Sequence, residues 1–176
     1  MTSQIELSVI PGAFKIENSI YRDVRGSLHK LNQYTDLGFL TKEVFFTTSN
    51  YATYRGMHLQ WGTHPTSKII TLISGSMSWF LLDCRPGTNQ GSIYRERIQH
   101  PLENSYLIPK GVAQGYVALA NNTTVLYQMD GDFCSKCDTG VKSMEILSLA
   151  ASEISRPLIL SKRDSGLGKS CERVIH

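Results

Sequence analysis

The chain has 176 residues, of which 41% are hydrophobic and 19% are charged. This length favours one hydrophobic core and therefore a single domain over residues 1–176. The net charge of +3 is mild, and the Lys and Arg residues are scattered, so composition gives no support to nucleic-acid binding. The sequence contains no apolar run of about 18 residues that could span a membrane, and its start lacks a signal-peptide pattern. We expect a cytoplasmic protein that contacts no membrane.

The four cysteines of the chain, Cys84, Cys134, Cys137 and Cys171, are expected to be free thiols, because the chain is of medium size and has no signal peptide. Cys134 and Cys137 have the Cys-x-x-Cys spacing of many zinc and redox sites. No second pair accompanies them, and zinc normally takes four ligands. The pair by itself therefore does not predict a metal site.

The first 40 residues predict a strand, a turn and at most a short helix. Apolar and polar residues alternate over positions 5–9, which predicts a strand at a sheet edge or one that pairs with another subunit. Further on, Asp23 and Gly26 bracket a turn that presents Arg25 near the start of another strand. One or two turns of helix are expected within residues 32–40.

From residue 43 onward, short runs rich in β-branched and aromatic residues alternate with clusters of Gly, Pro, Asn and Asp. Hardly any stretch has a helical period. This pattern predicts an all-β fold, an antiparallel sandwich or barrel of the jelly-roll kind, with short helices confined to the ends of the chain. The predicted strands are 43–49, 54–60, 68–74, 77–83, 92–98, 105–108, 115–119 and 123–129.

The strand Y-R-G-M-H-L-Q is predicted to form a pocket wall. In an extended strand Arg55 would share a face with Met57, and His58 with Gln60 would lie on the other. A lone histidine is more often structural than catalytic. Several polar residues lie near this histidine in the sequence: Arg55, Gln60 and, ten residues later, Lys68. Such a group of polar side chains is expected at the mouth of a barrel and favours a functional role for His58.

Other polar side chains stay ambiguous when they are considered one at a time. Lys68 also suits a solvated strand end, and Tyr127 suits a core position with its hydroxyl group satisfied. Asp164 and Glu145 could orient a histidine, but most carboxylates simply face water.

The jelly-roll prediction raises the question of a catalytic metal. Cupins, which have this fold, usually bind a divalent metal through a His-x-His pair, a glutamate and a later histidine. Here the pair is His58-Leu59-Gln60, and Gln114 stands at the later position. Glutamine is a poor ligand for transition metals, so the site lacks enough ligands. If the chain is a cupin, we therefore expect its chemistry to need no metal.

The chain contains seven motifs that can be compared with a known family: D-V-R-G-S-L, R-G-M-H-L-Q, K-I-I-T-L-I-S-G, L-D-C-R-P-G-T, I-P-K-G-V-A-Q-G-Y, V-L-Y and L-S-K-R-D. In order and spacing they resemble the dTDP-4-dehydrorhamnose 3,5-epimerase family over roughly residues 13–165. Members of that family are metal-free cupin homodimers that invert stereocentres beside the ketone of a nucleotide-linked 4-keto-6-deoxy sugar. They act in the synthesis of cell-surface glycans such as the O-antigen of lipopolysaccharide. The resemblance implies a cofactor-independent isomerase, a nucleotide-sugar 3- and/or 5-epimerase.

The resemblance implies a division of catalytic roles. Epimerisation needs a base on one face of the sugar ring, a proton donor on the other, and a cation to stabilise the enolate oxygen. By resemblance, His58 is the base and Tyr127 is the acid. Lys68 holds the enolate oxygen, and Asp164 orients His58 through its other ring nitrogen.

The resemblance also implies substrate-binding residues. Arg55 and Arg25 look like clamps for the diphosphate, because a guanidinium group makes bidentate contacts with phosphate oxygens. An arginine like Arg25 can reach the site of the partner subunit in this family, which implies a homodimer. Gln60 and Ser49 would help to place the sugar or the nucleotide.

The chain departs from the family pattern at two of the expected binding positions. Gln114 stands where the family usually has a histidine beside the reacting sugar. Glu145 falls, when the chain is counted without gaps from Tyr127, where the family's next motif begins with an aspartate. These differences imply a divergent relative with an altered preference for the sugar or the base.

Two other functions are compatible with the sequence. The first is a 3,4-ketoisomerase on the same scaffold, although those relatives favour R-G-x-H-A-H and this chain has Leu59 and Gln60. The second is a cupin that only binds a sugar nucleotide. Such a binding module has no need of the base and acid that His58 and Tyr127 would supply.

Overall fold

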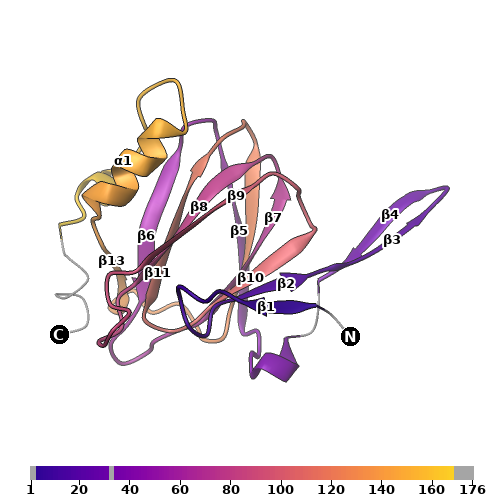
Figure 1. Cartoon of the computed structure of the whole chain (residues 1–176), viewed down its shortest axis with the longest axis horizontal. Helices are drawn as coiled ribbons and strands as arrows, with labels where there is room; N and C mark the ends of the chain where they lie inside the picture. The colour runs from indigo at the N-terminus through magenta and orange to yellow at the C-terminus, as the bar shows by residue number, and fades with distance from the viewer. Residues whose placement is uncertain (1–2, 32–33, 169–176) are drawn as a thin grey trace.

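Two antiparallel sheets face each other in the computed structural model, which describes residues 3–31 and 34–168. The arrangement confirms the predicted all-β fold (Figure 1). In spatial order, the first sheet contains β1 (Gln4–Glu6), β2 (Phe14–Glu17), β10 (Asn104–Ile108), β7 (Lys68–Ser74), β12 (Thr123–Met129) and β5 (Glu43–Ser49). The second contains β13 (Asp138–Gly140), β6 (Tyr54–Gln60), β11 (Val112–Ala118), β8 (Met77–Asp83) and β9 (Ile93–Ile98).

Most predicted strands are confirmed. The strands at 43–49, 54–60, 68–74, 77–83 and 123–129 have the predicted bounds, and the remaining three differ by one to three residues at an end. The helices are α1 (Met144–Ser152) and α2 (Lys162–Ser165), both near the C-terminal end, and a 3-10 turn, Thr35–Leu37. The 3-10 turn agrees with the one or two helical turns expected within residues 32–40, of which residues 32–33 lie outside the description.

The main core lies between the sheets, and a second core lies under α1. Strand β8 is buried at every position. Trp79 and its neighbours two residues away pack between the sheets, where its ring lies 4.8 Å from that of Tyr106. Phe80 points to the other face, where it belongs to the same buried cluster as Ile146 and Ala150 of α1. Because both faces are covered, β8 has a continuous apolar run in its middle instead of alternation.

A two-stranded hairpin, β3 (Ser19–Asp23) and β4 (Gly26–Lys30), projects from the body of the molecule (Figure 1). Its turn is the one predicted from Asp23 and Gly26, and it carries Arg25. The hairpin exposes large apolar side chains, including Val24 and Leu28. Strand β1 lies at the edge of the larger sheet, as predicted.

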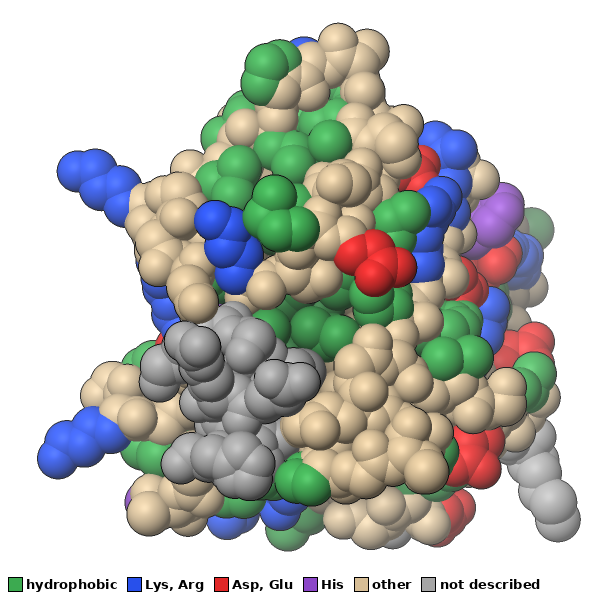
Figure 2. All heavy atoms as spheres, turned by 60° about the vertical axis from the view of Figure 1, so that its left-hand side comes forward, with side chains coloured by type: hydrophobic (Ala, Val, Ile, Leu, Met, Phe, Trp, Pro, Cys, Tyr) green, Lys and Arg blue, Asp and Glu red, His purple; other side chains and the backbone are tan. Residues whose placement is uncertain are grey.

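The surface on the α1 side carries Lys and Arg side chains dispersed among Asp and Glu (Figure 2). This distribution agrees with the scattered charges of the sequence. Within the part of the chain that the structure describes, no helix is long and apolar enough to cross a membrane.

The expectation of four free thiols is wrong for Cys84, which is disulfide-bonded. Cys134 and Cys137 are free. The prediction for Cys171 lies outside the described residues. Chain length and composition describe whole classes of protein, so they cannot decide the state of one cysteine.

The prediction that Arg55 shares a face with Met57 is also wrong. Gln114 of β11 pairs with His58 and Tyr116 pairs with Arg55, so three residue steps on β6 face two on β11. The extra residue is a β-bulge, which reverses the alternation on one side of it. Arg55 therefore joins His58 at the cavity described below, whereas Met57 packs in the core under α1.

Gly56 in this bulge is expected to be intolerant of substitution. It has a φ of +148°, and a Cβ atom there would lie 2.6 Å from the Cα of Gly115. Gly56→Ala should lower the free energy of unfolding in urea by about 3 kcal/mol or more, through both strain and overlap. The control is Gly62→Ala, where φ is +83° and nothing lies within 4 Å, with an expected cost of about 1 kcal/mol. Equal costs would contradict this account of the bulge.

Candidate active site

A cavity of about 270 Å³ lies between the two sheets and has walls from both. Strands β5, β7 and β12 of the larger sheet contribute side chains, as do β6, β11 and β13 of the smaller one, and the α2 segment closes part of the rim. The cavity brings together seven of the ten residues predicted from sequence: Arg55, His58, Gln60, Lys68, Gln114, Tyr127 and Asp164.

His58 and Asp164 form a close pair in this cavity. The Nε2 atom of His58 lies 2.8 Å from Oδ1 of Asp164. Ser161 caps the N-terminus of α2 and accepts a hydrogen bond of 3.0 Å from the Asp164 amide, which fixes where the carboxylate stands. The other ring nitrogen, Nδ1 of His58, is buried and has no hydrogen-bond partner among the described residues. An imidazole held at Nε2 by a carboxylate presents its free lone pair at Nδ1.

Asp164 is suited to remain ionised beside the imidazole. Burial by itself would raise the pKa of this carboxyl group, but contact with His58 and with Ser161, and the charge of Arg163, lower the pKa overall. A carboxylate that keeps its charge can hold the imidazole in one orientation and stabilise the imidazolium ion that forms when the ring takes up a proton.

Tyr127 lies on the opposite wall, on β12, and is only 4% exposed. Its ring stacks on that of Phe45 with centroids 4.9 Å apart and planes inclined by 10°. Burial and the nearby Tyr116 raise the pKa of its phenol, and interactions with neighbouring polar groups offset only part of this rise. The hydroxyl group therefore keeps its proton near neutral pH and can donate it.

Lys68 begins β7 and contributes a cation to the cavity. Burial lowers the pKa of its ammonium group to about 8, an effect that the charge of Asp138 opposes and that of Arg163 reinforces. The group is thus mostly protonated at neutral pH. Its charge is only weakly solvated, which favours a strong interaction with a developing negative charge.

Arg55 is held in position by residues behind the cavity wall. Its Nε atom donates a hydrogen bond of 2.9 Å to the hydroxyl oxygen of Ser49, and that hydroxyl also contacts the Tyr116 hydroxyl at 2.9 Å. Ser49 is buried and does not line the cavity. The structure therefore places Ser49 behind Arg55, at a position where it orients the guanidinium group.

The two glutamines of the site differ in their partners. The amide group of Gln60 donates to the carbonyl oxygens of His64 and Asp132, at 2.8 and 3.0 Å, and accepts from the amide of Cys134 at 2.9 Å. Its polar atoms thus tie two loops together. Gln114 lies opposite His58, and its Oε1 atom is buried without a partner among the described residues, so it can accept a hydrogen bond.

Two predicted residues lie away from the cavity. Arg25 is exposed on the hairpin and forms an ion pair of 2.6 Å with Asp23, which raises the pKa of Arg25. Glu145 is exposed in the first turn of α1, where a carboxylate is favoured by the helix dipole. Glu145 does not line this cavity, and its role in binding stays a prediction. Counting without gaps from Tyr127 takes no account of the length of the loop before β13.

Sequence reasoning missed several residues of the cavity wall. Asp138 of β13 and Arg163 both line it and form an ion pair of 2.7 Å. Arg163 could have been found, because it precedes Asp164 in the same motif. Phe45 could have been found by strand alternation, because it lies four residues before Ser49 in β5. Phe133 carries no comparable signal.

Comparison with known protein families places this chain beside sugar-nucleotide epimerases. A family model described as dTDP-4-dehydrorhamnose 3,5-epimerase matches residues 8–170. A curated relative, the dTDP-4-dehydrorhamnose 3,5-epimerase of Mycobacterium tuberculosis, is 26% identical over 133 residues. The match covers 70% of this chain and 65% of that protein, so the chain spans slightly less than two thirds of the relative's length.

Solved structures share the fold. The dTDP-6-deoxy-D-glucose-3,5-epimerase of Legionella pneumophila, in complex with dTDP-4-keto-L-rhamnose, superposes with a TM-score of 0.83 at 21% identity, covering 95% of this chain and 92% of that one. A 3'-monoepimerase from Streptomyces bikiniensis, in complex with dTDP-quinovose, gives a TM-score of 0.82 at 20% identity, covering 94% and 86%. At these identities the likeness establishes the fold.

Proposed function

Because the chain belongs to the dTDP-4-dehydrorhamnose 3,5-epimerase family, we propose that it inverts C3, C5 or both in a nucleotide-linked 4-keto-6-deoxy sugar. One observation carries the proposal. His58, which is paired with Asp164 of α2, lies on the smaller sheet, Tyr127 lies on the larger one, and both line a single cavity. A base and an acid on opposite walls are what inversion of a carbon centre requires.

In the proposed reaction, Nδ1 of His58 removes the proton from the carbon beside the ketone. Asp164 supports this step, since its carboxylate faces the other ring nitrogen and stabilises the imidazolium ion. The electron pair of the broken C–H bond moves toward the C4 carbonyl oxygen, which becomes an enolate oxygen. Lys68, as a half-buried cation in the same cavity, is placed to stabilise that oxygen.

Tyr127 completes the inversion from the other face of the ring. Its phenol donates a proton to the same carbon while the enolate collapses to the ketone, so the C–H bond is remade with the opposite configuration. Phe45, stacked on Tyr127, limits how far that ring can turn. The resulting phenolate then recovers a proton from solvent, and His58 returns its own proton to solvent.

Arg55 is the proposed contact for the diphosphate within this subunit. Its guanidinium group is fixed by Ser49 and lies at the cavity, so its donors are preorganised for phosphate oxygens. We assign Arg25 to the same task in the site of a second copy of the chain, in a homodimer. The projecting hairpin and the exposed Val44 and Phe46 of the edge strand β5 support that assembly.

The proposed substrate class sets the cellular role. Inverted 4-keto-6-deoxy sugars are precursors of deoxysugars in glycans such as O-antigen. Nucleotide sugars are intracellular metabolites, so we assign the activity to the cytoplasm.

The pH dependence of the proposed reaction should report Lys68. Since burial lowers its pKa to about 8, the ammonium charge is present below that pH and is lost above it. We expect kcat/KM of the wild type to fall about tenfold per pH unit above pH 8. Lys68→Arg should retain partial activity and shift this limb to higher pH, because guanidinium stays protonated. If kcat/KM of the wild type and of Lys68→Arg falls at the same pH, the loss of activity is due to the titration of another group.

A substrate panel tests the proposed function. The protein would be incubated with dTDP-, CDP- and GDP-linked 4-keto-6-deoxy sugars, and the products would be identified from proton NMR coupling constants around the ring. We expect an epimer at C3, C5 or both for at least one substrate. Migration of the ketone to C3 would indicate the 3,4-ketoisomerase alternative. Binding of a sugar nucleotide without any turnover would indicate a binding module and contradict the proposal.

A further inference from the structure

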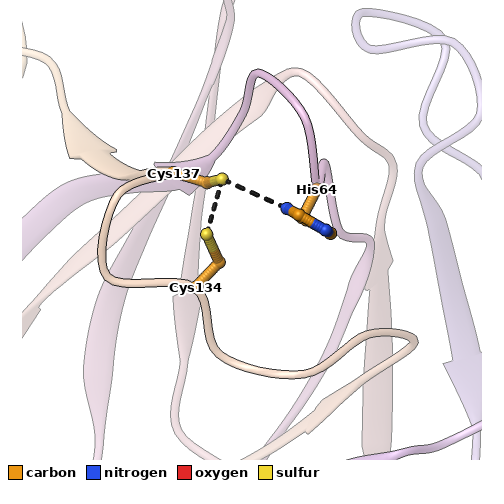
Figure 3. A group of neighbouring side chains, drawn as sticks. All are labelled: His64, Cys134 and Cys137. Atoms are coloured by element: carbon orange, nitrogen blue, oxygen red, sulfur yellow. Dashed lines mark hydrogen bonds between the residues drawn. The ribbon is translucent and has the colours of Figure 1, made fainter.

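A second group of chemically active side chains lies outside the cavity. His64, from the loop after β6, faces Cys134 and Cys137, from the turn before β13 (Figure 3). One ligand atom from each residue lies within 4.8 Å of the other two. Cys137 is buried, Cys134 is half-buried and His64 is exposed, so the group lies at the surface with an open side.

We propose that His64, Cys134 and Cys137 bind one divalent zinc ion, with water or an external group as the fourth ligand. Two thiolates and one imidazole match the preference of zinc for sulfur and nitrogen donors. In a tetrahedral site, with bonds of about 2.3 Å to sulfur and about 2.1 Å to nitrogen, the donors lie about 3.6 Å apart. The Sγ atom of Cys137 lies 3.6 Å from Nδ1 of His64.

One adjustment is needed for the ion to enter. The two sulfur atoms are 2.6 Å apart, whereas two thiolates on zinc lie about 3.8 Å apart. Rotation of the half-buried Cys134 side chain about χ1 moves its sulfur atom and leaves the backbone in place, so this rotation can provide the increase. Thr63 already contacts the Cys137 sulfur at 3.3 Å, and its hydroxyl group can donate to the thiolate once the metal is bound.

Hydrogen bonds of the backbone and of Gln60 hold the three residues close to one another. The amides of Cys137 and Asp138 both donate to the carbonyl oxygen of Cys134, at 3.0 and 2.9 Å, which closes the Cys-x-x-Cys segment into a tight turn. Gln60, only 2% exposed, then joins this turn to the other loop, since its amide group bonds both Cys134 and His64. The histidine is thereby held beside the cysteines by a buried anchor.

The third ligand favours a metal over a redox-active dithiol. Thiol–disulfide exchange needs only the two cysteines and an accessible attacking thiol. Here a nitrogen donor from a different loop is fixed beside them, and Figure 3 shows its ring turned toward the Cys137 sulfur. That arrangement completes the three protein ligands of an open zinc site.

The position of the group suggests that the ion would hold the rim of the cavity. Phe133 precedes Cys134 and Asp138 follows Cys137, and both line the cavity. A metal joining the two loops would therefore limit the motion of these two side chains. This consequence rests on the proposed function, whereas metal binding itself does not.

Metal titration tests the proposal without reference to catalysis. The protein would be treated with a reductant and a chelator, exchanged into anaerobic buffer and titrated with Co²⁺, followed by competition with Zn²⁺. We expect one equivalent per chain, thiolate-to-cobalt charge-transfer absorption, the visible bands of tetrahedral cobalt, and displacement by zinc. Cys137→Ser and His64→Ala should each weaken binding on the order of 100-fold.

Matched controls separate the site from other histidines and from misfolding. His100→Ala, a surface variant outside the group, should bind cobalt like the wild type. The circular dichroism of the metal-free variants should equal that of the metal-free wild type. The proposal is overturned if the reduced wild type binds no cobalt, if the spectrum lacks thiolate absorption, or if a folded Cys137→Ser variant binds as tightly as the wild type.

Discussion

Replacing His58 with asparagine is expected to lower kcat about 10³-fold and to abolish solvent exchange at the reacting carbon. Asparagine can still donate a hydrogen bond to Asp164, with which His58 makes a contact of 2.8 Å. It cannot take up a proton in the way an imidazole does. The measurement is kcat, together with deuterium incorporation by NMR, for the substrate identified in the panel.

The control for this variant is His100→Asn, which alters an exposed histidine outside the cavity and should leave kcat unchanged. A second variant, Asp164→Asn, tests the role of the carboxylate beside His58. It keeps the base but removes the charge that orients and stabilises it, so kcat should fall by less than in His58→Asn. Inversion at a normal rate by folded His58→Asn would show that another group is the base.

Replacing Tyr127 with phenylalanine is expected to separate proton removal from inversion. Phenylalanine keeps the ring that stacks on Phe45 but has no proton to donate. His58 can still remove and return the proton on its own face, so exchange of that proton with solvent should continue. Inversion should slow by about 10²-fold or more, because the opposite face has lost its acid.

The control for Tyr127→Phe is Tyr106→Phe. Tyr106 is also buried, and its hydroxyl group donates a hydrogen bond of 2.9 Å to Glu96, away from the cavity. This control variant should lose stability but keep its ratio of exchange to inversion. Parallel loss of exchange and inversion in Tyr127→Phe would mean that the tyrosine also serves proton removal.

The fold was largely predictable because its strands are short, regular and bounded by turn residues. Strands β5, β6, β7, β8 and β12 follow local composition, which the sequence displays directly. Which side chains of β6 point toward the cavity could not be predicted in the same way. The bulge depends on the partner strand β11, and alternation within one strand contains no information about the register of its neighbour.

The candidate site was predictable where a motif joins local structure to chemistry. His58, Lys68, Tyr127 and Asp164 were all chosen through motifs and all line one cavity. Glu145 was chosen by counting residues from Tyr127 across a loop. Loops vary in length between relatives, so such a count does not locate the next motif.

The group of His64, Cys134 and Cys137, for which we propose zinc binding, was missed for a related reason. Cys134 and Cys137 were visible as a pair, but His64 lies 70 residues earlier in the chain. The pairing of β13 with β6 and the hydrogen bonds of Gln60 bring the two loops together. A ligand set contributed by two loops is thus a property of the fold, which a search of local spacing cannot find.

Solvent exchange by the wild type is the most direct test of the claim that His58 starts the reaction by removing a proton beside the ketone. The protein would be incubated in deuterated water with the substrate identified in the panel, and each ring position would be followed by NMR. The account predicts that every inverted carbon carries deuterium, and that C1 and C2 carry none. An inverted product with its original hydrogen retained at that carbon would contradict it.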